Sequence, residues 1–386
     1  MRALPIVFLC SLGLFGCDSD NSSNNYNSNI KTTTDNLIEF STTVNADAES
    51  ISSQLWQHIQ STIKQNIEAT TQLKHQVEQL ALTPDKNTLN SSRQKWHLAH
   101  NKFQQVMALF SIGQINPSLF PQLQTSFANL DSQPIQPGYL DYFDVYKHSG
   151  IVNDLTLEIT AANIRSQHEL TDATDVSLGF HAIEYLLWGE TGQRPVTDFQ
   201  KKTQLNQQQR QNGMRLIDLP SHRRNTLLQL QTQLLIDDLN ALHYKLAQQN
   251  SGLQNTYDSV PALSRIQLWQ QAIKATLQNI ANSQLLTDLT PATSESTLHS
   301  NFAGANLSRI AATLIGIDQL VVIQDAEQNT ILNWLTEEDA LTFTQQLNAT
   351  MVELESFIKQ GTALSVEQKA ATTAQLQLLA ALMSNQ

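Results

Sequence analysis

The sequence has very little cysteine. Its 386 residues include two cysteines, Cys10 and Cys17, both close to the N-terminus. The rest of the chain therefore offers no thiol for a disulfide, for thiolate catalysis, for a cysteine-ligated zinc site or for an iron–sulfur cluster. A folded body must be stabilised by packing and hydrogen bonding.

Basic residues are also few, and several common motifs are missing. Lys and Arg number 23 against 35 Asp and Glu, which gives a net charge of −12. Such a chain repels nucleic acid, and no basic patch with interleaved aromatic residues appears. There is no glycine-rich phosphate loop and no His-Glu-x-x-His zinc motif. The nearest approach to that motif, His168–Asp172, ends in aspartate, so we do not assign a helical zinc-peptidase site there.

The N-terminal apolar run is short. It extends from Ala3 to about Phe15, after Arg2, whereas a bilayer span needs about 20 apolar residues. The pattern predicts a lipoprotein signal peptide in residues 1–16. The run ends in Leu-Phe-Gly-Cys, which resembles a bacterial lipobox with Cys17 as the lipidated residue. The alternative is an ordinary signal peptide with an unmodified cysteine.

A polar segment follows the cysteine. Residues 18–35 (DSDNSSNNYNSNIKTTTD) are almost all Ser, Asn, Asp and Thr. Such a segment buries too little apolar surface to offset the entropy lost on folding. We therefore expect residues 17–35 to form a disordered tether between a lipid bilayer and the folded body. This predicts a periplasm-facing lipoprotein of the bacterial cell envelope, and leaves open whether the inner or the outer membrane holds it.

The remaining sequence has the apolar spacing of helices. The expected helices cover residues 56–80, 88–110, 151–165, 175–188, 228–246, 261–284, 304–322, 337–359 and 366–383. No segment alternates with a period of two, so we predict an all-α fold. Residues 111–150 are rich in proline and are expected to be mainly irregular.

A polar stretch at residues 191–212 suggests a domain boundary. It divides the folded part into an N-terminal helical bundle, 36–200, and a C-terminal helical bundle, 201–386. A weak internal similarity between Gln54–Ile67 and Gln267–Ile280 is compatible with two related bundles.

The string GFHAIEYLLWGE, Gly179–Glu190, has the most specific pattern in the chain. His181 and Glu184 are three residues apart and share a helix face, where they can ligate one metal ion or hydrogen-bond to each other. Gly179 allows another backbone or a ligand to approach closely. A plain structural pair, in which the carboxylate satisfies a partly buried histidine, remains the alternative.

This string resembles the signature of the imelysin (peptidase M75) family. The family pattern is Gly-x-His-x-x-Glu followed by an apolar run that ends in Trp-Gly. Looser similarities occur at Trp96–Ala99, Gly138–Tyr142 and His299–Phe302. Altogether the resemblance extends over residues 39–383.

The resemblance implies two helical-bundle domains with a ligand site in the cleft between them, a cell-envelope location and a link to iron uptake. The residues expected at the cleft are Gly179, His181, Glu184, Tyr185, Trp188, Tyr139 and Asp141. The expected metal ligands are His181 and Glu184, and the expected metal is iron or zinc.

The chain departs from the family pattern at several positions. His100 and Met107 stand where many relatives have Arg and Glu, and Ala303 and Arg309 replace a serine and an acid. Fewer carboxylates weaken a site for a hard metal ion. Two histidines on the second helix, His97 and His100, could supply nitrogen ligands instead, and His100 is the one we include as a further metal ligand.

Two functions remain open. The first is a non-catalytic binding lipoprotein that takes a metal, a small molecule or a protein in the cleft, with iron-uptake or envelope proteins as partners. The second is a metallopeptidase that uses His181 and Glu184. A peptidase requires a further histidine or carboxylate that converges on His181.

Overall fold

The computed structural model describes residues 46–249, 252–285, 302–361 and 364–383. The expected signal peptide (1–16), the expected lipidation site Cys17, the expected tether up to residue 35 and His299 lie outside these residues. Within them there are helices and no β-strand, apart from an isolated bridge between Phe143 and Tyr146. The prediction of an all-α fold is confirmed.

The α-helices have the following bounds: α1 Ala46–Leu82, α2 Lys86–Gln104, α3 Met107–Ile115, α4 Pro121–Asp131, α5 Ala161–Gln167, α6 Gly179–Trp188, α7 Gln207–Gln211, α8 Pro220–Ala247, α9 Gly252–Asp258, α10 Ala262–Asn279, α11 Asn306–Val321, α12 Glu337–Gln360 and α13 Val366–Leu382. Short 3-10 turns cover Val196–Phe199, Leu216–Asp218 and Ile331–Trp334, and a π-helical turn, Ile280–Leu285, extends α10. No helix among the described residues combines the length and apolarity needed to cross a bilayer.

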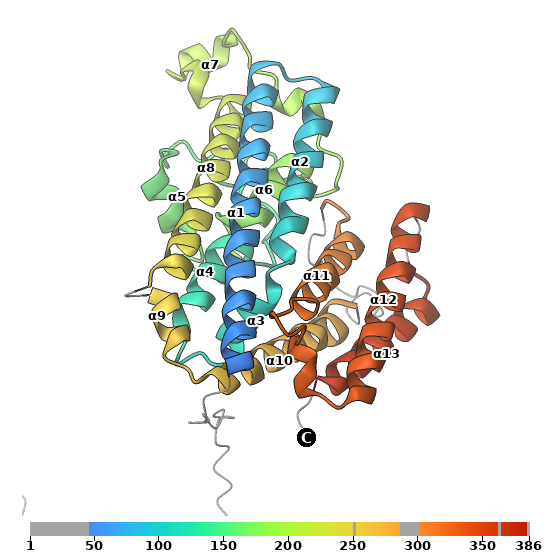
Figure 1. Cartoon of the computed structure of the whole chain (residues 1–386). Coiled ribbons are helices and arrows are strands. Elements are labelled where there is room, and N and C mark those ends of the chain that lie inside the picture. The colour runs from blue at the N-terminus through green and yellow to red at the C-terminus, as the bar shows by residue number, and fades with distance from the viewer. Residues whose placement is uncertain (1–45, 250–251, 286–301, 362–363, 384–386) are drawn as a thin grey trace, which may run out of the picture. The chain divides into compact units, whose positions relative to one another are not determined.

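The first two helices form a hairpin around a break at Pro84. The Asp85 carboxylate accepts a hydrogen bond from the backbone N–H of Thr88, and the Thr88 hydroxyl accepts one from the backbone N–H of Asp85, so the pair caps the start of α2. In Figure 1, α1 and α2 run side by side and α8 packs against α1. The apolar stripe of α1 is buried against these two neighbours and against α10.

Helix α6 lies in the interior. All ten of its residues are buried, and it packs against α2, α4 and α8. A helix enclosed in this way must pair every polar side chain that it carries, because an unpaired buried polar group costs free energy. His181 and Glu184 of α6 accordingly have defined partners.

The two similar segments, Gln54–Ile67 and Gln267–Ile280, meet at one tyrosine. The Trp56 ring stacks on Tyr257 at 4.2 Å, and the Trp269 indole N–H donates to the Tyr257 hydroxyl at 2.9 Å. Each segment therefore contributes a tryptophan to the same core. Helix α8 follows residue 200 but packs on α1 and α6, and the boundary between residues 200 and 201 stays a prediction.

Several expected helix bounds were wrong. Of residues 151–165, only those from Ala161 onward are helical, in α5. Helix α6 begins at Gly179 rather than at Asp175, whose carboxylate accepts hydrogen bonds from two backbone N–H groups of the preceding loop. The proline-rich region contains α4, which has Pro121 at its first position, where proline needs no hydrogen-bond partner.

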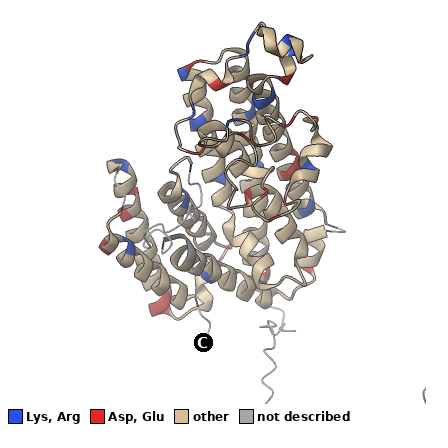
Figure 2. Cartoon of the chain, turned by 180° about the vertical axis from the view of Figure 1, so that it is seen from behind, with Lys and Arg blue, Asp and Glu red and all other residues tan. Residues whose placement is uncertain are grey.

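Charged residues of both signs are interspersed along the described helices (Figure 2). The excess of acidic residues is therefore not gathered on one helix.

Candidate functional site

The two expected ligand residues of α6 form a buried pair. The His181 Nδ1–H donates to Glu184 Oε2 at 2.7 Å, one turn further along the helix. The side chains are 3% and 1% exposed, so bulk water does not screen this interaction. Because Nδ1 is engaged, His181 presents Nε2 to other groups.

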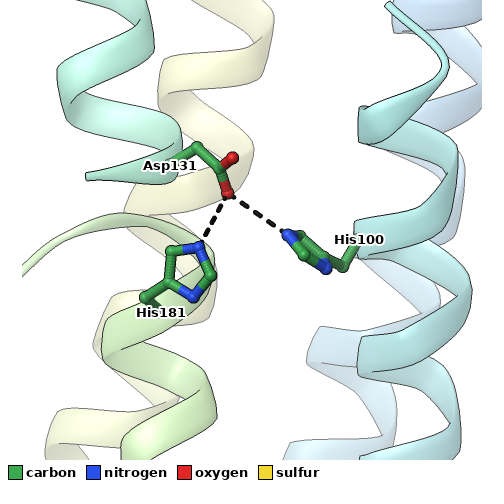
Figure 3. A group of neighbouring side chains, drawn as sticks. All are labelled: His100, Asp131 and His181. Carbon is green, nitrogen blue, oxygen red and sulfur yellow. Dashed lines mark hydrogen bonds and ion pairs between the residues drawn. The ribbon is translucent and has the colours of Figure 1, made fainter. Parts of the chain in front are cut away.

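That Nε2 atom faces a carboxylate from another helix. Asp131, the last residue of α4, places Oδ1 3.2 Å from His181 Nε2 and 3.3 Å from His100 Nε2. The carboxylate thus lies between the two imidazoles, as Figure 3 shows. One ligand atom from each of the three residues lies within 4.8 Å of the other two. All three are buried, and we call them the His–Asp–His cluster.

Gly179 brings α4 and α6 together at this point. Its φ of +80° lies in the left-handed region that glycine enters freely. A Cβ atom there would lie 2.5 Å from the carbonyl oxygen of Leu130. The missing side chain therefore allows the start of α6 to touch the end of α4, and this contact sets Asp131 opposite His181.

Aromatic packing fixes His100 on α2. Its ring stacks on Trp96 with a centroid distance of 4.6 Å. The Trp96 indole N–H donates to the backbone oxygen of Phe180 at 2.9 Å, which ties α2 to α6. The other expected nitrogen ligand, His97, instead meets the edge of Trp188 and lies outside the cluster.

Gln104, one turn after His100, completes the surroundings. Its Nε2 lies 3.1 Å from Asp131 Oδ2 and 3.1 Å from His100 Nε2. The His100 Nε2 atom holds at most one hydrogen, so it cannot both donate to Asp131 and accept from Gln104. One of these two contacts of His100 Nε2 is therefore not a hydrogen bond.

The pKa values of the two histidines in the cluster shift in opposite directions. Burial acts to lower the pKa of His181, but Asp131 and Glu184 outweigh it and raise that pKa to about 9. Burial dominates for His100 and lowers its pKa, although Asp131 opposes the effect. The metal-free cluster therefore holds its proton on His181 at neutral pH.

Glu184 also binds the segment before α11. Its second oxygen, Oε1, accepts the backbone N–H of Ala303 at 2.8 Å. Next to it, the Phe302 ring meets the edge of Tyr185 at 5.0 Å. Both carboxylate oxygens of Glu184 are therefore occupied, one by His181 and one by the chain that leads into α11.

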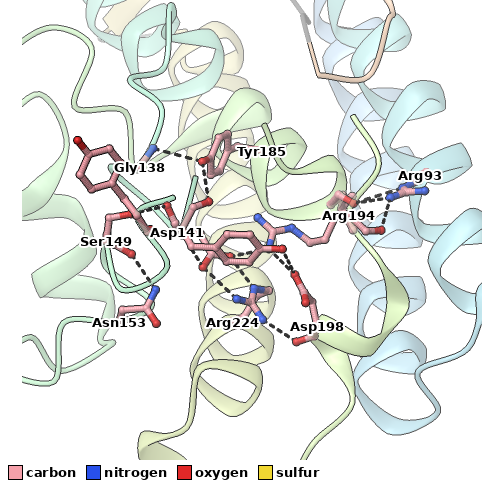
Figure 4. Close-up of polar contacts among 12 residues, drawn as sticks. Arg93, Gly138, Asp141, Ser149, Asn153, Tyr185, Arg194, Asp198 and Arg224 are labelled. Atoms are coloured by element: carbon pink, nitrogen blue, oxygen red, sulfur yellow. Dashed lines mark hydrogen bonds and ion pairs between the residues drawn. The ribbon is translucent and has the colours of Figure 1, made fainter. Parts of the chain in front are cut away.

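A second buried network surrounds Asp141. Two guanidinium groups bind this carboxylate: Arg194 at 2.8 Å and Arg224, through two nitrogens, at 2.5 and 3.0 Å. Figure 4 shows this group with Asp198, which also accepts from Arg194. Burial acts to raise the pKa of Asp141, but the two arginines hold it below its usual value. Asp141 is thus a structural counter-ion for two buried cations.

The remaining expected cleft residues belong to this network or to aromatic packing. The Tyr185 hydroxyl donates to the backbone oxygen of Tyr142 at 3.2 Å, and accepts the N–H of Gly138. Tyr139 donates to the backbone of Gln167. Trp188 packs on Trp96 and His97. None of these three aromatic side chains is part of the His–Asp–His cluster.

The structure therefore divides the expected site. It brings together Gly179, His181, Glu184 and His100, and it holds Tyr139, Asp141, Tyr185 and Trp188 in other contacts. Sequence analysis missed Asp131 and Gln104. Gln104 was detectable, because it lies four residues after His100 on the same helix face.

Comparisons with known proteins agree with the fold. The family model described as Imelysin (Peptidase_M75) matches residues 59–385. An imelysin-like protein from Psychrobacter arcticum superposes with a TM-score of 0.59 and 14% identity, covering 88% of this chain and 94% of that one. A candidate iron-regulated protein A precursor from Parabacteroides distasonis gives a TM-score of 0.56 and 13% identity, covering 89% and 96%. No curated protein matches the chain.

Proposed function

Since this chain belongs to the imelysin (peptidase M75) family, we propose that it is a non-catalytic metal-binding protein of the cell envelope whose site is the His–Asp–His cluster. The observation that carries the proposal is the convergence of His100, Asp131 and His181 on one point in the interior.

The chemistry of the donors fits a divalent transition metal. His100 and His181 would bind through Nε2, and Asp131 through a carboxylate oxygen. Two imidazoles and one carboxylate are a ligand set that suits iron(II) and zinc. The Nδ1–H of His181 donates to Glu184, an arrangement that fixes the tautomer and orientation of a ligating histidine. Glu184 is therefore assigned as the partner that orients a ligand, in place of the direct ligand role expected from the sequence.

Asp131 lies 3.2 Å from His181 Nε2 and so meets the ligand requirement of the peptidase alternative. The residue that disfavours that alternative is therefore Glu184. A metal-dependent peptidase needs a base that can take a proton from a bound water. Glu184 has both oxygens engaged, at 2.7 Å by His181 and at 2.8 Å by Ala303. Binding without hydrolysis is the function that these contacts support best.

Iron is the first metal to test. One similar structure belongs to a candidate iron-regulated protein, although at 13% identity the likeness extends only to the fold. Zinc binds most nitrogen and oxygen sites more tightly than iron(II), so both metals have to be tested. Lipidation at Cys17 would hold the site at a membrane surface, with iron-uptake or other envelope proteins as partners.

The test is metal analysis and titration calorimetry on the purified protein. We expect one iron(II) or zinc ion per chain. Loss of a partner that only orients a ligand typically weakens metal binding about 10–100-fold, and Asp131→Asn, which removes a ligand, should weaken it more. Asp237→Asn, at an exposed position on α8, is the matched control and should bind like the wild type. Wild-type protein that binds neither metal would refute the proposal. Peptide hydrolysis that chelators stop and His181→Ala abolishes would establish the alternative.

A further inference from the structure

A cavity of about 240 Å³ adjoins the His–Asp–His cluster. It is lined by residues of α2, α3, α10 and α11, and by residues at α4 and just after it. At about 30 Å³ per water, it has room for roughly eight waters, or for one small organic molecule. Gln104 lines the cavity and also contacts His100 and Asp131. This side chain is therefore a shared wall between cavity and cluster.

The cavity has an exposed mouth and a buried end. Gln114 and Asn279 are exposed and hydrogen-bonded to each other at 2.9 Å. Gln104 and Arg309, at 0% and 1% exposure, are the two most deeply buried residues of the lining. A small molecule that entered past Gln114 would meet progressively more enclosed polar groups.

The described part of the lining carries a positive charge. Among the described residues of the lining, Arg309 is the only charged one; the others comprise four amides, three hydroxyls and three apolar side chains. A buried guanidinium beside amide N–H groups favours an oxyanion, because charge-assisted hydrogen bonds strengthen where water is excluded. The cation is notable in a chain whose net charge is −12.

Gln104 has an unused acceptor at this wall. Its Oε1 is buried and accepts no hydrogen bond from the described residues, while its Nε2 faces Asp131 and His100. A half-turn of the amide exchanges the two atoms with almost no change of shape. Oε1 would then face the cluster, where a cation needs acceptors, and the NH₂ group would be free to donate on the other side.

We propose that this cavity binds a small oxyanion, a carboxylate or an inorganic phosphate, and that Gln104 couples its binding to that of the metal. The coupling rests on the proposed metal site. When metal is bound, the Gln104 amide is turned so that its NH₂ group donates a hydrogen bond to the oxyanion. Without metal, the Gln104 Oε1 atom faces the oxyanion and repels it. Each ligand therefore raises the affinity of the other by the same factor.

The test is calorimetric titration of malonate and of phosphate into the full chain, metal-free and zinc-loaded with unbound zinc removed. We expect at least one of the two anions to bind, about 10-fold more tightly to the zinc-loaded protein. The anion that binds identifies the source of the oxyanion. Arg309→Met should weaken it about 10- to 100-fold, and Arg309→Lys should weaken it less, because the charge is kept.

Gln104→Glu separates this proposal from a simple loss of folding. The new carboxylate should repel the oxyanion while it strengthens zinc binding, and a misfolded variant could not show both changes. Zinc binding without anion binding in the wild type, or equal anion binding in wild type, Arg309→Met and Gln104→Glu, would overturn the oxyanion site. Anion binding with no zinc binding would refute the metal site and the coupling but leave the oxyanion site standing.

Discussion

Glu184 holds His181 through a 2.7 Å hydrogen bond and holds the chain before α11 through the backbone N–H of Ala303 at 2.8 Å. One buried carboxylate therefore serves two donors from different parts of the chain. This arrangement needs two acceptor atoms, which a carboxylate has and a carboxamide lacks.

Glu184→Gln should consequently damage both metal binding and stability. One amide oxygen can accept from only one of the two donors, and the NH₂ group then faces the other. We expect a loss of about 1–3 kcal/mol in the free energy of unfolding, from one unsatisfied buried donor. Metal affinity should fall about 10–100-fold, because the ligand histidine loses its orienting partner. Urea denaturation and calorimetry measure the two effects. Glu68→Gln, exposed on α1, is the control, and equal behaviour of the two variants would contradict the assignment.

Gly179 offers a second test, because it has a natural control. Gly179 and Gly213 both have positive φ angles, of +80° and +70°. A Cβ at Gly179 would lie 2.5 Å from Leu130 O, whereas nothing lies within 4 Å of one at Gly213. Gly213→Ala should cost about 1–2 kcal/mol, the strain of the left-handed region. Gly179→Ala should cost clearly more by urea denaturation. It should also weaken metal binding, because the backbone must move apart where Asp131 meets His181; similar losses for both variants would contradict this account.

The sequence predicts the helices of the fold better than it predicts the residues of the site. Apolar spacing identifies α1 and α10 correctly, since a continuous buried stripe leaves a periodic trace in the sequence. The same spacing predicts a helix at residues 151–165 that is too long. Its first residues belong to a loop that contains buried apolar side chains, and the helix begins at Ala161. The loop around Asp141 folds about the side chains of Arg194 and Arg224, which are distant in the sequence and leave no periodic pattern.

In the site, too, neighbours along the chain are found from the sequence and residues distant in the sequence are missed. His181 and Glu184 are found from the sequence because both lie on one short helix. Asp131 is not, because it reaches His181 through contact between α4 and α6, and nothing near residue 131 marks it as a ligand. A resemblance that rests on a local motif therefore locates the pair and misses the residue that turns it into a three-ligand cluster.

The network at Asp141 predicts a large stability effect. Asp141→Asn leaves Arg194 and Arg224 without the buried carboxylate between them, and breaking a buried pair on one side typically costs about 3–5 kcal/mol. Asp238→Asn is the contrast. Asp238 pairs with a partly exposed Arg165, and burial raises the pKa of Asp238 despite that arginine. Loss of the Asp238 carboxylate should therefore lower the free energy of unfolding by at most about 1 kcal/mol. Guanidinium denaturation of both variants measures the difference, and equal midpoints would show that Asp141 is not a structural counter-ion.

The cluster predicts opposite pH dependences for the metal-free and metal-bound protein. The pKa of His181 rises from 6.5 to about 9 on folding, so its protonated form stabilises the metal-free protein fully below pH 6.5, and this contribution is lost as the pH rises through about 9. A metal ion needs the neutral imidazole and competes with that proton, so metal binding should strengthen over the same interval. The increase in melting temperature caused by zinc should therefore grow from pH 6.5 to pH 9, while the melting temperature of the metal-free protein falls. His75→Gln, exposed on α1, should reproduce both trends, whereas His181→Gln should abolish both. A zinc-induced shift that stays constant with pH would mean that zinc does not displace the His181 proton, and that His181 is not a ligand.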